Sequence, residues 1–106
     1  MVMPDVFNFI HTTLIAELAE RHRVPAVYSL PFSTARGGLL AYSTEYAELW
    51  RRTATYVDRL FRGASLADLL VQQPNKFDLS SNLKTARAIG LVVPTSLLAR
   101  ADEVIE

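Results

Sequence analysis

The chain has 106 residues, enough for one small domain, and 50% of them are apolar, so a packed core is expected and disorder is not. Eleven basic residues balance eleven acidic ones, which gives no support for binding nucleic acid or an anionic membrane through bulk charge. The absence of cysteine excludes disulfides, thiol catalysis and thiolate metal sites. No apolar run approaches the roughly 20 residues of a membrane span, and the N-terminus lacks the pattern of a signal peptide, so the chain as written is expected in the cytoplasm.

The first part of the chain predicts a strand, a helix and a second strand. Residues 1–3 have the composition of a short strand, which the following proline ends. Asp5 or Asn8 caps the next helix, and Pro25 ends it because the residue before a proline avoids the helical region. Residues 25–28 are an apolar run between breakers, the pattern of a buried parallel strand. The apolar stripe of the helix consists of Phe7, Ile10, Leu14, Ile15 and Leu18.

The middle of the chain predicts a strand followed by the longest helix. Residues 29–38 form a loop, and residues 39–42 form a short apolar strand. Thr44 caps the helix, which runs over residues 45–62 and ends at Gly63. One face of this helix is apolar and consists of Tyr46, Leu49, Trp50, Thr53, Val57, Leu60 and Phe61. The opposite face is charged, is expected to be solvated, and consists of Glu48, Arg51, Arg52, Asp58, Arg59 and Arg62.

The last part of the chain predicts one more strand and two helices. Residues 76–79 alternate polar and apolar side chains, which is typical of an exposed or edge strand. Ser81 or Asn82 caps the next helix, and Gly90 ends it. A short helix follows over residues 95–100, and the acidic tail is expected to be non-helical because its charges oppose a helix dipole.

The order of these elements predicts the fold class. Strands that alternate with amphipathic helices favour βαβ units and a parallel sheet. The chain is therefore predicted to be an α/β protein, a partial Rossmann-like parallel sheet with flanking helices. So few elements leave one face of a parallel sheet poorly covered. We therefore expect the chain to be one piece of a larger α/β protein.

No catalytic or metal-binding pattern is present. His11 and His22 lack a carboxylate at metal-ligand spacing, so both are expected to be surface residues. The serines include no Gly-x-Ser-x-Gly elbow. The run Arg36-Gly37-Gly38 lacks the spacing of a phosphate loop and is expected to be a tight turn. No cofactor, no metal and no enzymatic activity are therefore predicted.

Polar side chains follow three of the predicted strands. Asp5, Ser29 and Ser43 each stand just beyond a strand end. Ligands bind outside the carboxyl ends of the strands in open α/β sheets, so these residues predict a binding edge. Simple N-capping of the following helix is the alternative explanation for Asp5.

Long stretches of the sequence match a known family. They are PDVFNFIHTTLIAELAERHRVPAVYS, GGLLAYS, YVDRLFRGASLADLLVQQPNKFDLSSNLKTARAIGL and the ending PTSLLARADEVIE. Together they resemble the C-terminal part of ABC-transporter substrate-binding proteins, in the tryptophan/tyrosine-transport branch. The resemblance implies a type I periplasmic binding protein fold, in which two α/β lobes joined by three crossover segments close on a small ligand.

The resemblance also implies a division of the chain. Residues 1–41 and 75–106 would belong to the C-terminal lobe, and residues 42–74 would form a crossover and a helix that packs on a missing N-terminal lobe. The expected interface consists of Tyr46, Leu49, Trp50, Val57 and Phe61. The implied function is solute binding for delivery to a membrane ABC permease. Full-length members are periplasmic, and the ligand would be held only with the missing lobe present.

The resemblance adds a role for Asp5. Amino-acid-binding members have a Thr-Asp-Asn stretch at the corresponding strand end, and Asp5 falls on its Asp, although Pro4 and Val6 replace the flanking residues. A carboxylate there would pair with a ligand ammonium group. With Ser29, and with Tyr42 and Ser43 at the crossover, it forms the expected ligand-binding set.

A different class of protein fits the same helix. Without a second lobe, the apolar face of the helix over residues 45–62 would be a large exposed patch, and such patches drive association. The alternative is a truncated, self-associating structural module without transport activity. It would form a symmetric dimer that buries Trp50, Val57 and Phe61.

Overall fold

The computed structural model describes all residues from Met1 to Glu106. They form two compact units: unit 1 contains residues 1–43 and 78–106, and unit 2 contains residues 44–77. The strands are β1 (Val27–Tyr28), β2 (Leu40–Thr44), β3 (Phe77–Asn82) and β4 (Glu103–Ile105). The helices of unit 1 are α1 (Val6–Ile10), α2 (Thr12–Arg21), α4 (Leu83–Ile89), α5 (Thr95–Leu98) and the 3₁₀ turn η1 (Pro31–Ser33). Unit 2 contains α3 (Tyr46–Phe61) and the 3₁₀ turn η2 (Leu66–Asp68).

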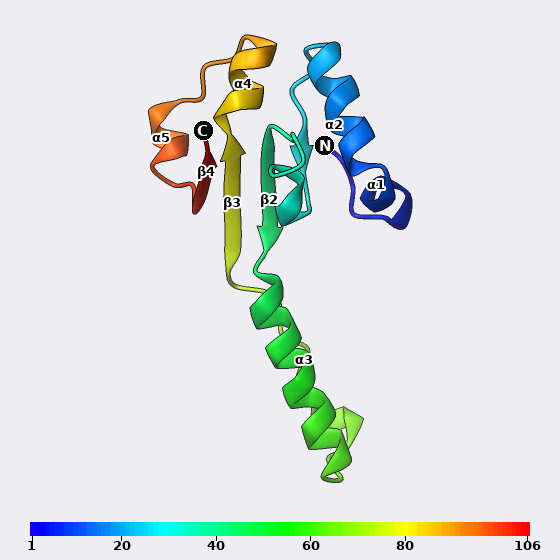
Figure 1. The fold of residues 1–106 in the computed structure, drawn as a ribbon. Helices are drawn as coiled ribbons and strands as arrows, with labels where there is room; N and C mark the ends of the chain where they lie inside the picture. Colours follow the sequence, from blue (N-terminus) through cyan, green and yellow to red (C-terminus); the bar gives the residue numbers. More distant parts are fainter. The chain divides into compact units, whose positions relative to one another are not determined.

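The four strands form one sheet in the order β1-β2-β3-β4 (Figure 1). The β1–β2 and β3–β4 pairs are parallel, with Val27 opposite Leu40 and Ser80 opposite Glu103. The arrows of β2 and β3 point in opposite directions in Figure 1, and the Asn82 amide donates to the Leu39 carbonyl at 2.9 Å. A mostly parallel sheet with flanking helices confirms the α/β prediction. The reversal between β2 and β3, which enclose unit 2 in the sequence, was not predicted.

The predicted N-terminal helix is two helices, because His11 leaves the helical region with φ −98° and ψ 14°. Asp5 caps α1, since its Oδ1 accepts a hydrogen bond from the Asn8 amide at 2.9 Å. Just beyond the break, the Thr12 hydroxyl donates to the Asn8 and Phe9 carbonyls, a bond that often bends helices. A single continuous helix was therefore the wrong prediction for this segment.

The interior of unit 1 is built from small and polar residues. The apolar core is the cluster of Ala16, Tyr28 and Ala41. A Cβ on Gly38 would stand 2.8 Å from the Ser33 carbonyl oxygen and 2.9 Å from the Tyr28 ring, so this close packing requires glycine. The buried polar residues outnumber the buried apolar ones and are Thr12, Ser33, Thr34, Ser43, Ser80, Ser81, Asn82 and Thr85.

The apolar stripe predicted for the first helix lies mostly on the outside. Helix α2 instead buries the small residues Thr12 and Ala16, and Ala16 packs against Tyr28 and Ala41 of the sheet. The exposed members of the stripe are Phe7, Ile10, Leu14 and Leu18. The helical periodicity therefore identified an amphipathic element but not the face that the sheet covers.

Hydrogen bonds hold the loop over residues 29–38 against β3 and α4. Asn82 Nδ2 donates to the Thr34 carbonyl at 2.8 Å, and the Thr34 and Ser80 hydroxyls lie 3.0 Å apart. The Thr85 hydroxyl donates to the Gly37 carbonyl at 3.0 Å. The side-chain oxygen of Asn82 also caps α4 through the Thr85 amide, so Asn82 rather than Ser81 is the cap.

The C-terminal strands differ from the prediction. β3 extends to Asn82 and lies between β2 and β4, with its last three residues buried, so it is not an edge strand. The acidic tail is non-helical as predicted, but Glu103–Ile105 pairs with β3 as a strand. Gly90 ends α4 in the left-handed conformation with φ 79°, as predicted.

Unit 2 is a helix with a return segment along it. α3 begins after Glu45 and has no side-chain cap; Thr44 is the last residue of β2, so the predicted Thr44 cap is wrong. No residue of α3 is buried. The return segment, residues 65–76, is held against α3 by side-chain hydrogen bonds. In one of them the Tyr56 hydroxyl donates to the Leu70 carbonyl at 2.7 Å.

Candidate functional site

Asp5 lines an open apolar cavity at the surface of unit 1. Both carboxylate oxygens accept hydrogen bonds from Asn8: Oδ1 from the backbone amide at 2.9 Å and Oδ2 from Nδ2 at 2.6 Å. The carboxylate is thus fixed in place, and each oxygen keeps a lone pair for a further donor. The cavity has a volume of about 470 Å³ and is lined by Pro4, Asp5, Val6, Phe9 and Leu30. It is open to solvent, since Val6 and Phe9 in its lining are 75% and 48% exposed.

The other predicted ligand residues have different surroundings. The Ser29 hydroxyl donates to the Val2 carbonyl at 3.0 Å, so its proton is engaged within the sheet. Tyr42 is exposed, whereas its neighbour Ser43 is buried, because successive strand residues face opposite sides of the sheet. These two residues therefore do not line the same surface.

Ser43 lines a second cavity of unit 1, which we call the acidic cavity. It has a volume of about 210 Å³ and is lined by Pro31, Ser43, Asp78, Leu79, Ser80, Asp102 and Glu103. Asp102 is held in place because its Oδ2 accepts a hydrogen bond from the Leu79 amide at 2.8 Å. Its own amide donates to the Leu79 carbonyl, also at 2.8 Å. The acidic cavity is therefore built across the β3–β4 pair.

Four of these residues, Asp78, Ser80, Asp102 and Glu103, were missed by sequence reasoning. They were missed because β4 was not predicted. Three residues of an acidic tail do not have a recognisable strand pattern. The parallel pairing of Ser80 with Glu103 brings the tail to the start of β3. Leu30 lines the cavity beside Asp5 and Pro31 lines the acidic cavity, so the two cavities adjoin along the chain.

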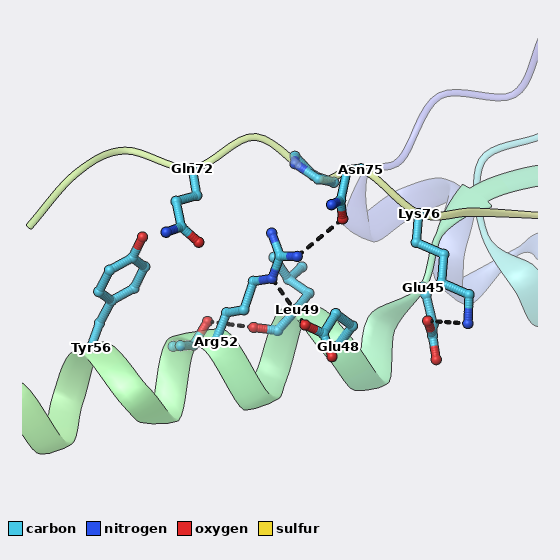
Figure 2. Close-up of a pocket in the computed structure, with 10 residues that line it drawn as sticks. Glu45, Glu48, Leu49, Arg52, Tyr56, Gln72, Asn75 and Lys76 are labelled. Carbon is cyan, nitrogen blue, oxygen red and sulfur yellow. Dashed lines mark hydrogen bonds and ion pairs between the residues drawn. The ribbon is translucent and has the colours of Figure 1, made fainter.

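Unit 2 has a small cavity between α3 and the return segment (Figure 2). Its volume of about 60 Å³ is well below the roughly 300 Å³ at which small-molecule pockets begin. The Arg52 side chain crosses this cavity. Its Nε donates a hydrogen bond to Glu48 Oε1 and its Nη2 donates one to Asn75 Oδ1, each at 3.0 Å. Lys76 Nζ pairs with Glu45 Oε2 at 2.7 Å. These contacts fasten the return segment to α3 and leave no room for a solute.

The charged face of α3 is therefore only partly solvated, contrary to the prediction. The hydrogen bond from Arg52 holds the pKa of Glu48 below its usual range. Arg51 and Arg62 fit the prediction, since both side chains are more than 70% exposed. Arg52 was misassigned because sequence periodicity does not show that another segment of the chain covers this side.

The apolar face of α3 is exposed within unit 2. Trp50 is 67% exposed and Phe61 is 87% exposed. The other exposed large apolar residues of this helix are Leu49, Val57 and Leu60. Tyr46, the remaining predicted interface residue, is partly buried.

Comparison with known proteins identifies the family. The sequence matches the family described as ABC transporter substrate binding protein over residues 4–105. The chain belongs to this family. The resemblance noted in the sequence is confirmed. A search of the curated proteins found no match.

Three solved structures share the fold. A conserved domain protein from Vibrio cholerae O1 biovar El Tor has a TM-score of 0.87 at 24% identity, over 94% of this chain and 34% of its own. The ABC domain from Streptococcus pneumoniae in complex with L-Trp has a TM-score of 0.75 at 24% identity, over 86% and 32%. The ligand-free, open form of a substrate-binding protein with adhesive properties from Clostridium difficile has a TM-score of 0.61 at 18% identity, over 95% and 34%.

The chain spans about one third of the length of these solved structures. It therefore corresponds to part of a periplasmic-binding-protein fold. None of its helices is both long enough and apolar enough to cross a membrane.

Proposed function

We propose that the chain is part of the solute-binding component of an ABC import system, which delivers a small organic solute to a membrane permease. The match over residues 4–105 to the substrate-binding family carries this proposal. The role is binding rather than catalysis, and the complete protein acts in the periplasm. The solute enters at the edge of the sheet where Asp5 and Ser43 line cavities.

The solute we propose is amino-acid-like. Its ammonium group pairs with the Asp5 carboxylate, which Asn8 holds in place by two hydrogen bonds. Its apolar side chain lies in the adjoining cavity against Phe9 and Leu30. The S. pneumoniae relative in complex with L-Trp supports an amino acid as the solute class.

A second lobe is needed to complete the cleft. The apolar face of α3 remains exposed in unit 2, and we assign it to contact with that lobe. Binding proteins of this kind gain affinity by enclosing the solute between lobes, so the 106-residue chain alone binds weakly. In the absence of the lobe, the same face makes the chain self-associate as a dimer through Trp50, Val57 and Phe61.

Titration of the ¹⁵N-labelled chain with L-Trp tests the site. We expect weak binding, with chemical-shift changes at Asp5, Phe9 and Leu30, because these residues share one cavity. Asp5→Asn should abolish the changes, since the amide cannot balance the ammonium charge. The matched control is Asp58→Asn, which removes an exposed carboxylate of α3 and should leave the titration unchanged.

Two results would contradict this proposal. An absence of chemical-shift changes at the Asp5 cavity with every amino acid would exclude the site. Nanomolar affinity of the chain alone in calorimetry would contradict the need for enclosure by a second lobe.

A further inference from the structure

Phe9, which lines the Asp5 cavity, belongs to a stack of three side chains. Its ring lies edge to face with the ring of Phe32, with the centroids 5.3 Å apart and the planes at 85°. The guanidinium of Arg36 lies over the Phe32 ring, 4.6 Å from its centroid. Aromatic pairs and cation–π contacts both favour such geometry. We call these three side chains the aromatic stack.

The aromatic stack joins the two segments that form the cavity. Phe9 belongs to α1. Phe32 and Arg36 belong to the loop over residues 29–38. The same loop contributes Leu30 to the lining of the cavity, whereas Phe32 and Arg36 do not line it. Any effect of these two residues on a solute is therefore exerted through Phe9.

Phe9 needs support from outside its own helix. α1 has five residues and buries none of them, and Phe9 itself is 48% exposed. An exposed side chain on so short a helix has several rotamers open to it. The ring of Phe32 lies where it restrains Phe9 to one of them.

Arg36 restrains Phe32 in turn. None of the protein's salt bridges involves Arg36, so no carboxylate draws the guanidinium away from the ring. Arginine suits this role because its guanidinium is planar, weakly hydrated and stacks on aromatic faces. The restraint therefore runs from Arg36 through Phe32 to Phe9.

We propose that Phe32, held by Arg36, is a positioning residue that fixes the Phe9 ring as a wall of the solute cavity. It thereby sets the selectivity of the site for large apolar side chains over small ones. This inference rests on the proposed solute-binding role and extends it to two residues outside the cavity. A wall that is fixed before the solute arrives loses less conformational entropy on binding. A solute too small to reach Phe9 gains nothing from it.

Titration of the ¹⁵N-labelled chain with L-Trp and with L-Ala tests this role. Both solutes carry the ammonium group that Asp5 binds in the proposed site, but only L-Trp has a side chain large enough to lie against Phe9. Phe32→Leu should weaken L-Trp binding by about fivefold, which corresponds to the free energy of an aromatic pair, and leave L-Ala binding unchanged. Phe32→Tyr keeps the ring and should retain the L-Trp affinity of the parent chain.

Variants of Arg36 test the same role without changing the half-buried Phe32. Arg36 is exposed, so Arg36→Gln should fold like the parent chain. It should lower the L-Trp affinity by about twofold and weaken the nuclear Overhauser effect between the Phe9 and Phe32 rings, whereas Arg36→Lys keeps the cation and should have a smaller effect. Arg21→Gln removes an exposed arginine of α2 and is the matched control, which should leave both titrations unchanged.

The outcomes separate this role from the proposed function. Equal losses of L-Trp and L-Ala affinity in Phe32→Leu would assign Phe32 to the folding of the loop and overturn the positioning role. Unchanged L-Trp affinity in both Phe32→Leu and Arg36→Gln would also overturn it and leave the solute-binding role intact. An absence of shifts at the Asp5 cavity with either solute would count against the proposed site itself, and the positioning role would fall with it.

Discussion

The two units of this protein use their polar and apolar residues in opposite ways. Unit 1 buries serine, threonine and asparagine side chains and leaves the apolar stripe of α1 and α2 mostly exposed. Unit 2 buries no residue of α3, and its polar side chains fasten the return segment. In unit 1 the hydrogen bonds between buried polar groups stabilise the fold, because water does not compete for them. In unit 2 the polar groups are at least partly exposed, so water competes for the same hydrogen bonds.

The largest effect is expected from Asn82, whose side chain joins the loop over residues 29–38 to the start of α4. Asn82→Ala removes the bonds to the Thr34 carbonyl and to the Thr85 amide, both buried. Loss of a buried partner and a helix cap should lower the free energy of unfolding by about 2–4 kcal/mol. Urea denaturation followed by circular dichroism measures this loss. Asn75→Ala in unit 2 is the control, and an equal loss there would contradict the contrast between the units.

The next effect concerns assembly rather than folding. Trp50→Asp places a charge in the exposed apolar face of α3, so it should abolish self-association without lowering stability, because Trp50 is 67% exposed. Light scattering at micromolar concentration measures the mass of both proteins. Arg51→Ala, a change to the neighbouring exposed residue, should leave the mass unchanged. A monomeric parent chain would count against the dimer, and an unchanged dimer in Trp50→Asp would count against this face.

A smaller effect is expected from Arg52, which links α3 to the return segment. Arg52→Ala should speed amide hydrogen exchange over residues 65–76 and have only a small effect on global stability, since the pair with Glu48 is partly exposed. The stabilisation from Glu48 is present above its unfolded pKa, near 4.3, and is lost as pH falls through its lower folded pKa. Arg62→Ala is the control, because its bond to Asp58 is exposed and fastens no other segment. Equal exchange in both variants would exclude the fastening role.

The smallest effect at neutral pH is expected from Tyr28. Burial raises the pKa of the Tyr28 phenol above its ordinary value of 10.0. The unfolded chain therefore loses this proton first, and stability falls as pH rises from about 10 through the folded pKa. Tyr28→Phe should remove this loss of stability at alkaline pH. At neutral pH it should change the free energy of unfolding by less than about 1 kcal/mol, because the Tyr28 hydroxyl has no hydrogen-bond partner. Thermal unfolding at several pH values measures it, and an unchanged alkaline slope would contradict the assignment.

How far the site was predictable differs from residue to residue. Asp5 was recognised because a strand end followed by a cap is a local pattern, and it does line a cavity. Asp78 and Asp102 were not recognised, because they are 24 positions apart and meet only through the β3–β4 pairing. Ser43 was selected for its position after a strand, yet its lack of a hydrogen-bond partner became visible only in the folded chain.

The sequence by itself determined the family, the α/β class and the identity of most elements, including the glycine that ends α4. These properties depend on local periodicity, helix caps and motifs along the chain. The tertiary structure decided which face of α2 is covered, that the acidic tail is a strand, and that β2 and β3 run in opposite directions. Periodicity shows that a helix has two faces, but close packing of small residues and hydrogen bonds between distant segments determine which face is buried. The acidic cavity results from those distant contacts.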